Sequence, residues 1–254
     1  QTWFHGMKVL ISPVFDGNQY QKQLISHLEH EGVEVVSDRS THPPARLIWE
    51  IIRNVPDVIH LHWTHPYFLF GTEDWPYRIP GVGLIAVFFA ILFVTQIKLI
   101  GQLSMRLVWT VHNLCNHENR YPNIDRWVGI QLAKEADVLQ VWDESTRADV
   151  ADYLEVPKFK IKVVPHGGYS DLFDTVKSPT QVQAREILDI SEFTRVLLYF
   201  GLIRPYKEVP TLIETFSKLG FDNACLLVAG NPMQDGLEQR VRDLGDSDPN
   251  VRLD

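Results

Sequence analysis

Short apolar runs alternate along the chain with longer segments in which apolar residues recur every three or four positions. The runs have the length of buried strands, and the longer segments have the period of amphipathic helices. Strands are predicted at residues 7–15, 33–38, 57–65, 106–113, 136–143 and 161–168. Helices are predicted within residues 16–32, around 45–53, at 124–135 and at 145–154, the last one capped by Ser145. This alternation predicts a parallel sheet with helices on both faces.

The same alternation begins again near residue 181. Helices are predicted at residues 182–188, 210–219 and 236–245, and strands at 195–201, at 223–230 and from Val251 onward. We therefore predict an α/β protein with two Rossmann-like domains, at 7–168 and 181–254, joined by a linker at 169–180. Because two strands and the start of a third are few for such a domain, we expect the second domain to be incomplete.

Composition narrows the class of protein. Apolar residues make up 45% of the 254 residues and charged residues 22%, as in an ordinary soluble α/β protein. The formal net charge of −8 argues against a nucleic-acid partner, because binding a phosphate backbone needs a basic surface. Cys115 and Cys225 lie far apart and form no disulfide framework, and the residues before Met7 lack the pattern of a secretory signal. We therefore expect a cytoplasmic protein.

One segment, residues 81–100, is long and apolar enough for a membrane span, with Lys98 as its single charge. Thr95 and Gln96 interrupt its apolar run, and predicted strands of one domain lie on both sides of it in the sequence. A span would put those strands on opposite sides of the membrane. The segment is therefore predicted to be a buried or interfacial helix, in peripheral contact with the inner face of a membrane or covering an acceptor groove.

A loop in the second half predicts a phosphate site. The apolar strand that precedes it ends at Gly201, and the loop then carries Arg204 and Lys207 before the next helix begins. The predicted apolar face of that helix consists of Leu212, Ile213, Phe216 and Leu219. Two cations just beyond the carboxyl end of a buried strand, beside a helix amino terminus, are suited to holding phosphate.

Four short patterns in a fixed order carry a resemblance to a known family. They are a loop after the first strand, Thr-Val-His-Asn at 110–113, Val-Val-Pro-His-Gly at 163–167, and the loop with Arg204 and Lys207 followed by Ala-Gly-Asn at 229–231. Together they resemble the GT-B glycosyltransferases, and most closely the group-1 type, glycosyltransferase family 4. The resemblance covers almost the whole chain. It implies an acceptor-side domain at 7–168 and part of a nucleotide-sugar domain at 181–254.

The resemblance also implies roles for particular residues. Arg204 and Lys207, with Gly17, would bind the diphosphate of the nucleotide-sugar donor, and His112 would be the catalytic residue that orients sugar and acceptor. Further candidate residues of the cleft are Asn18, His62, Asn113, His166 and Asn231. Two positions depart from the family pattern, because Glu208 stands where glycine is usual and Asn113 where aspartate is usual. An amide takes no proton, so no acid–base role transfers to Asn113.

The implied reaction is transfer of a sugar from a UDP- or GDP-linked donor to an acceptor hydroxyl, with retention of anomeric configuration. The acceptor would be a glycan, a lipid-linked glycan or a polysaccharide precursor. The family binds the donor through cations and helix ends, so no cofactor and no metal are expected. The family's glutamate pair, which binds donor sugar and ribose, is expected beyond Asp254.

Other classes of function remain open at this stage. His60 and His62 lie on one face of a strand and, with His112, would suit the metal site of a metal-dependent hydrolase. An epimerase with the same fold would use the same phosphate site. A non-catalytic fragment would need a partner chain to complete its cleft. A nicotinamide-dependent dehydrogenase is disfavoured, because no G-x-G-x-x-G follows the first strand.

Overall fold

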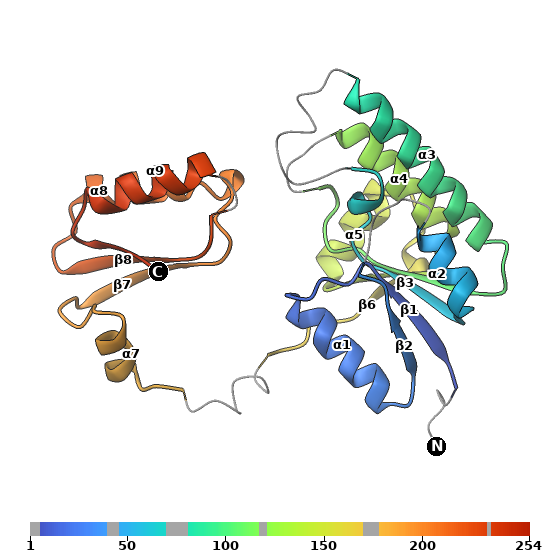
Figure 1. The fold of residues 1–254 in the computed structure, drawn as a ribbon, viewed down its shortest axis with the longest axis horizontal. Coiled ribbons are helices and arrows are strands. Elements are labelled where there is room, and N and C mark those ends of the chain that lie inside the picture. Colours follow the sequence, from blue (N-terminus) through green and yellow to red (C-terminus); the bar gives the residue numbers. More distant parts are fainter. Residues whose placement is uncertain (1–5, 40–45, 70–80, 117–120, 170–177, 233–234) are drawn as a thin grey trace. The chain divides into compact units, whose positions relative to one another are not determined.

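The computed structural model describes residues 6–39, 46–69, 81–116, 121–169, 178–232 and 235–254 (Figure 1). The chain divides into two compact units, residues 1–167 and 168–254. Most of the predicted linker at 169–180 lies outside the described residues, and the roles predicted for the two domains stay predictions at this stage.

The first unit is built on a six-stranded sheet with the order β2-β1-β3-β4-β5-β6, in which every neighbouring pair is parallel. The strands are β1 (Lys8–Ser12), β2 (Glu34–Ser37), β3 (Val58–Leu61), β4 (Arg106–Thr110), β5 (Val138–Val141) and β6 (Ile161–Val163). Its helices are α1 (Gln19–His30), α2 (Arg46–Asn54), α3 (Val82–Ile100), α4 (Pro122–Glu135) and α5 (Glu144–Tyr153), with short 3-10 turns η1 (His65–Tyr67) and η3 (Lys158–Lys160).

Side chains of β1 alternate between the two faces of this sheet. Val9 and Ile11 pack with residues of α1, whereas Leu10 belongs to the large core formed with α2, α3 and α4 (Figure 1). Leu24, Ile25 and Leu28 of α1 pack against Val9 and Ile11 on that face of the sheet. The predicted arrangement of helices on both faces of a parallel sheet is therefore present in this unit.

The second unit contains a three-stranded parallel sheet with the order β7-β8-β9. The strands are β7 (Arg195–Phe200), β8 (Ala224–Ala229) and β9 (Val251–Leu253), and the helices are α7 (Gln181–Ile187), α8 (Val209–Leu219) and α9 (Asp235–Asp246), with a 3-10 turn η4 (Pro205–Lys207). α8 and α9 cover one face, where Ile213, Phe216 and Val241 pack on β8. A smaller cluster around Phe193 packs on the other face.

Two local predictions are wrong. Leu219 was assigned to the apolar face of α8, but it is 60% exposed because the helix ends there and Gly220 turns the chain in a left-handed conformation. Ser145 was assigned as the cap of α5, but Asp143 is the cap. The carboxylate of Asp143 accepts hydrogen bonds from the backbone N–H of Thr146 and from the hydroxyl of Ser145, and these bonds lower the pKa of Asp143 to about 2.

Candidate functional site

The carboxyl edge of the first sheet carries a cluster of rings. β3, β4 and β5 end immediately or shortly before His62, His112 and Trp142, and Tyr20 lies in the first turn of α1. Because parallel strands end at a common edge, residues far apart in sequence meet there. This ring cluster consists of Tyr20, His60, His62, Trp63, His112, Trp142 and His166.

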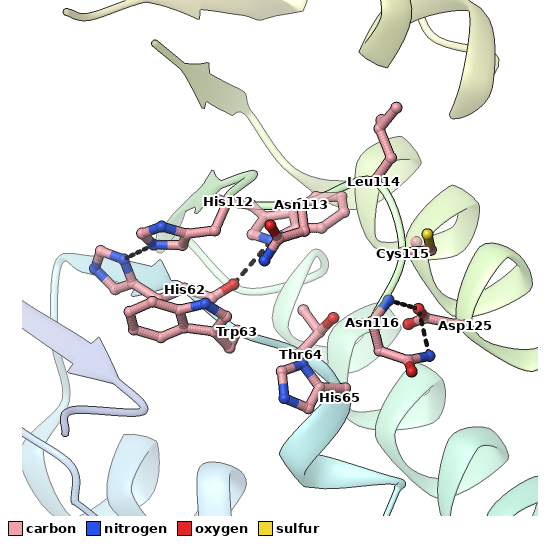
Figure 2. A pocket seen from close by; sticks show the side chains of 12 residues that line it. His62, Trp63, Thr64, His65, His112, Asn113, Leu114, Cys115, Asn116 and Asp125 are labelled. Atoms are coloured by element: carbon pink, nitrogen blue, oxygen red, sulfur yellow. Dashed lines mark hydrogen bonds between the residues drawn. The ribbon is translucent and has the colours of Figure 1, made fainter. Parts of the chain in front are cut away.

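A hydrogen bond joins the two central histidines. His62 Nδ1 lies 3.0 Å from His112 Nε2 (Figure 2). His60 stacks on His62 with ring centroids 4.4 Å apart, as expected for two residues on one face of a strand, and its Nε2 lies 2.8 Å from Thr110 Oγ1. On the other side, Trp63 stacks on His112 at 4.0 Å and 13°. The paired imidazoles are therefore held between further rings.

Burial keeps these histidines neutral at physiological pH. Desolvation lowers the pKa of His60 from 6.5 to about 4 and that of His112 to about 3, and it holds the pKa of His62 well below its usual value. Repulsion between the neighbouring imidazoles lowers the pKa values of His62 and His112 further. The three side chains can therefore act through hydrogen bonds but not as fixed positive charges.

The geometry disfavours the metal-dependent hydrolase. Ligands of a metal ion direct their lone pairs to one point, whereas the facing nitrogens of His62 and His112 are bonded to each other and His60 is bonded to Thr110. Across the described ranges of the chain, no group of three or more His, Cys, Asp or Glu side chains could hold a metal ion.

A pocket opens beside the ring cluster (Figure 2). Its lining includes Trp63, His65, Trp109, His112, Asn113, Asn116 and Asp125. The loop after β4 is held at Asn116, because the backbone N–H and side-chain amide of Asn116 both donate to Asp125 Oδ2, at 2.6 Å and 3.0 Å. Flat rings next to amide and carboxylate groups suit a ligand with both apolar faces and hydroxyl groups.

The loop after β1 holds the two other candidates of the first unit. Asn18 is the cap of α1, and its side-chain oxygen accepts from the backbone N–H of Gln21 at 3.0 Å. A Cβ placed on Gly17 meets no atom within 4 Å, so nearby atoms do not demand glycine here. The phosphate-binding role of Gly17 stays a prediction.

Two glycines shape the corresponding loops of the second unit. Gly201 directly follows β7 and has a φ of +128°, a conformation that favours glycine, and its N–H donates to Ala229 O at 3.0 Å. A Cβ added to Gly230 would lie 2.0 Å from the carbonyl oxygen of Gly201. Further along, the N–H of Ile203 donates to Asn231 O at 2.9 Å. The loops after β7 and β8 therefore run in direct contact.

This contact places the predicted cations at the amino end of α8. Arg204 precedes the turn η4 and Lys207 is the last residue of that turn, with Lys207 Nζ 6.0 Å from the ring centroid of Tyr199. Glu208 adopts the left-handed conformation, with a φ of 53°, which explains why glycine is usual at this position. Its carboxylate accepts from the hydroxyl of Thr211 at 2.8 Å, within the first turn of α8. Next to these loops, a hollow of about 330 Å³ is lined by Gly230, Asn231, Glu238, Arg242 and Asp254, among others.

No family model matches the chain. A curated relative does: the GDP-mannose:glycolipid 4-beta-D-mannosyltransferase of Xanthomonas campestris pv. campestris is 32% identical over 179 residues. The match covers 69% of this chain and 42% of the relative, so the chain spans less than half the length of the enzyme it matches.

Solved structures with a similar fold cover nearly all of the chain. Anabaena HepE in complex with UDP and glucose has a TM-score of 0.60 at 17% identity, over 97% of this chain and 68% of that one. The chain has the GT-B fold. The UDP-GlcNAc 2-epimerase of Neisseria meningitidis bound to UDP-GlcNAc also aligns, with a TM-score of 0.55 at 12% identity over 97% and 72% of the chains. The fold alone therefore does not separate transferase from epimerase.

The predicted GT-B residues form two groups, one in each unit. His62, His112 and His166 meet in the ring cluster, and Asn113 lines the pocket beside it. Arg204, Lys207 and Asn231 lie on the touching loops of the second unit. Sequence reasoning missed Tyr20, Trp63, Trp142, Asn116 and Asp125. Only Trp63 and Trp142 had a signal, because each lies next to a polar or imidazole residue, His62 or Asp143, near the end of a predicted strand.

Proposed function

We propose that this GT-B chain is part of a glycosyltransferase that moves a sugar from a UDP- or GDP-linked donor to a hydroxyl of a lipid-linked glycan. The observation that carries the proposal is the pair of cations, Arg204 and Lys207, on a loop held in place by the Gly201–Gly230 contact at the amino end of α8. The relationship to a mannosyltransferase supports a transferase rather than an epimerase.

During sugar transfer, negative charge develops on the departing diphosphate, and the protein must compensate it. Cations and helix N–H groups that are already in position supply this without reorganisation during the reaction. The carboxylate of Glu208 is bonded to Thr211, so it is engaged beside the site. No metal is required by this arrangement. The retention of anomeric configuration that the family resemblance implies is not part of the proposal, because a 4-beta-mannoside made from alpha-linked GDP-mannose has inverted configuration.

The acceptor would use the pocket of the first unit. In this pocket the ring of Trp63 offers a flat surface for the face of a sugar. The side chains of Asn113, Asn116 and Asp125 offer hydrogen-bonding groups for sugar hydroxyls. The relative acts on a glycolipid, which supports a lipid-linked acceptor of this kind.

A membrane surface in the first unit fits such an acceptor. α3 is the one helix among the described residues that is long and apolar enough to cross a membrane, yet it lies against the core with Ala86, Ala90 and Phe93 buried. Its opposite face is exposed, with Leu84 at 76% and Phe88 at 62%. A helix that is packed on one face and apolar on the other suits the plane of a bilayer surface.

α2 extends this surface. The backbone N–H of Ile48 donates to Gln96 Oε1 of α3 at 3.3 Å, and Trp49 and Ile52 of α2 are 62% and 66% exposed. The single acidic residue in the two helices, Glu50, is buried and paired with Arg46. We name the exposed apolar residues of these two helices the apolar surface. They are Trp49, Ile52, Leu84, Ile85, Val87, Phe88, Ile91 and Leu99. The apolar surface carries no exposed carboxylate, in a chain with a net charge of −8, and it would dock on the inner face of the membrane.

Calorimetric titration with UDP, GDP and ADP tests the donor site. We expect one base to be preferred, EDTA to have no effect, and Lys207→Ala to weaken binding by about tenfold, the typical loss for a charge-assisted hydrogen bond. Lys218→Ala is the matched control, because Lys218 is an exposed lysine on the last turn of α8 and its loss changes the net charge equally. A folded sample that binds none of the nucleotides, or that loses binding equally in both variants, would contradict the proposal.

A further inference from the structure

The side chain of His62 has a bonding pattern that the proposed reaction does not account for. It is 1% exposed, and one of its nitrogens, Nδ1, is bonded to His112 Nε2 at 3.0 Å. The other nitrogen, Nε2, has no hydrogen-bond partner among the described residues. Buried polar atoms are normally satisfied, so this orphaned nitrogen restricts how the pair can share protons.

Two arrangements of a neutral pair are possible, because each imidazole carries one N–H and one lone pair. If His112 donates from Nε2, then His62 accepts at Nδ1 and must bury an unpaired N–H at its own Nε2. If His62 donates from Nδ1, only an unpaired lone pair is left at Nε2. In proteins, buried N–H donors without a partner are rarer than buried acceptors without a partner. The second arrangement is therefore favoured.

In this arrangement His112 accepts at Nε2 and must carry its own proton at Nδ1. Which nitrogen of a histidine is protonated is set by the bond that the other nitrogen makes. We propose that His62 is a positioning residue that fixes His112 in the Nδ1–H tautomer, so that His112 donates a hydrogen bond to a substrate oxygen. This inference rests on the proposed glycosyltransferase function.

The surroundings of the pair keep its geometry. Trp109 Nε1 donates to the carbonyl oxygen of His62 at 3.0 Å, which fixes the backbone after β3. His60 stacks on the ring of His62, and Trp63 stacks on the ring of His112. Neither imidazole can rotate without displacing a neighbouring ring. His112 is thus an N–H donor to a substrate oxygen and not a general base.

Long-range ¹H–¹⁵N NMR spectra of the ¹⁵N-histidine-labelled chain test the tautomer directly. We expect the His112 signals to show a protonated Nδ1 and an unprotonated Nε2 near neutral pH. A protonated Nε2 on His112 would overturn the proposal. This readout needs no substrate, so it decides the matter even if the chain transfers no sugar.

Two substitutions separate positioning from simple packing. In His62→Asn the amide nitrogen can stand near the place of Nδ1 and still donate to His112, whereas in His62→Gln the amide extends toward the place of Nε2. We expect His62→Asn to keep the His112 tautomer and to transfer sugar within about threefold of the natural chain. His62→Gln should mix the two tautomers and lose about 10- to 100-fold in turnover, the usual loss when the partner that orients a functional histidine is removed.

Nucleotide binding is the internal control, because Arg204 and Lys207 lie in the other unit. Both His62 variants should bind the nucleotide as the natural chain does, so that the loss falls on turnover. Equal tautomers and equal turnover in the two variants would overturn the role of His62. Absence of nucleotide binding in the natural chain would instead count against the proposed function alone.

Discussion

The two units hold their candidate groups by opposite means. In the first unit, neutral imidazoles are fixed by burial and by stacking between other rings. In the second unit, the half-buried Arg204 and the exposed Lys207 lie on loops whose course is fixed by contacts between Gly201 and Gly230. The first site depends on side-chain packing, and the second depends on backbone shape.

This difference follows from the different chemical roles proposed for the two sites, phosphate binding by cations and hydrogen bonding by a neutral imidazole. A cation for phosphate must stay charged, and burial without a partner would disfavour its charge. An imidazole that donates one defined hydrogen bond must stay neutral with a fixed proton, and burial favours the neutral form. The same fold therefore exposes one set of groups and buries the other, and substitutions should affect the two sites in different ways.

The largest effect is expected at Gly230. In Gly230→Ala the new Cβ would lie 2.0 Å from the carbonyl oxygen of Gly201, so the two loops must separate. We expect the free energy of unfolding of the second unit to fall by about 3 kcal/mol, as for severe overpacking, and nucleotide binding to be lost. Gly236→Ala is the control, because a Cβ there meets nothing within 4 Å.

The position of the tryptophans allows this loss to be assigned to one unit. All seven tryptophans lie before residue 168, so their fluorescence follows the first unit, whereas circular dichroism follows both. In Gly230→Ala the fluorescence transition in urea should stay in place while part of the dichroism transition moves to lower urea. A shift of the fluorescence transition by the same amount would show that the contact supports the whole chain.

The buried histidines predict that the first unit loses stability in mild acid. The pKa of His60 is about 4 when folded and 6.5 when unfolded, so protons bind to the unfolded state first as pH falls below 6.5. The contribution of neutral, buried His60 to the stability of the folded state is complete above pH 6.5, and it decreases as the pH falls toward the folded pKa of about 4. The pKa of His112 is also lowered in the folded state, so His112 changes the stability in the same direction. Between pH 6.5 and about pH 5, His60 alone should remove about 2 kcal/mol.

Urea unfolding followed by tryptophan fluorescence at several pH values measures this slope. His60→Gln removes the titrating group but keeps an amide nitrogen in reach of the Thr110 hydroxyl, which His60 Nε2 contacts at 2.8 Å. The slope should become shallower in this variant, whatever its stability at neutral pH. An unchanged slope would mean that the group titrates normally in the folded chain.

A smaller effect is expected on the apolar surface. Phe88→Glu places a carboxylate on the exposed face of α3, so binding to vesicles that contain anionic lipid should weaken by about tenfold. Phe159→Glu is the matched control, because Phe159 is 74% exposed on η3, outside the two docking helices. Co-sedimentation with vesicles measures both. Equal loss in the two variants would indicate a charge effect without a specific docking face.

Much of this fold follows from the sequence, because apolar alternation sets strands and helices locally. His60 and His62 were predicted to share a strand face, and their rings stack. The GT-B fold itself was predicted from motifs and is confirmed by structural similarity. By contrast, α3 is apolar on all sides, so its sequence could not indicate that Ala90 faces the core while Phe88 faces outward.

The parts of the site that were missed depend on pairs distant in sequence. The hydrogen bond between His62 and His112 joins residues 50 positions apart, and no local pattern encodes it. Asn116 and Asp125 are closer together, but their bond depends on how the loop after β4 meets α4. The prediction of Ser145 as the cap of α5 was a local error. Aspartate and serine are both good capping residues, and only the course of the backbone decides that Asp143 is the cap.

The smallest effect is expected at Gly17, which lies in the loop between β1 and α1. No φ in the left-handed region and no neighbour within 4 Å demands glycine there, unlike at Gly201 and Gly230. Gly17→Ala should therefore raise the free energy of unfolding slightly, by about 0.5 kcal/mol, because alanine restricts the unfolded chain. Stability by tryptophan fluorescence and nucleotide affinity by calorimetry then report separate properties of one variant. The expected small rise in stability together with weaker nucleotide binding would support the predicted contact between this loop and the donor phosphates. Unchanged affinity would leave phosphate binding to the loops of the second unit, where backbone shape and charge coincide.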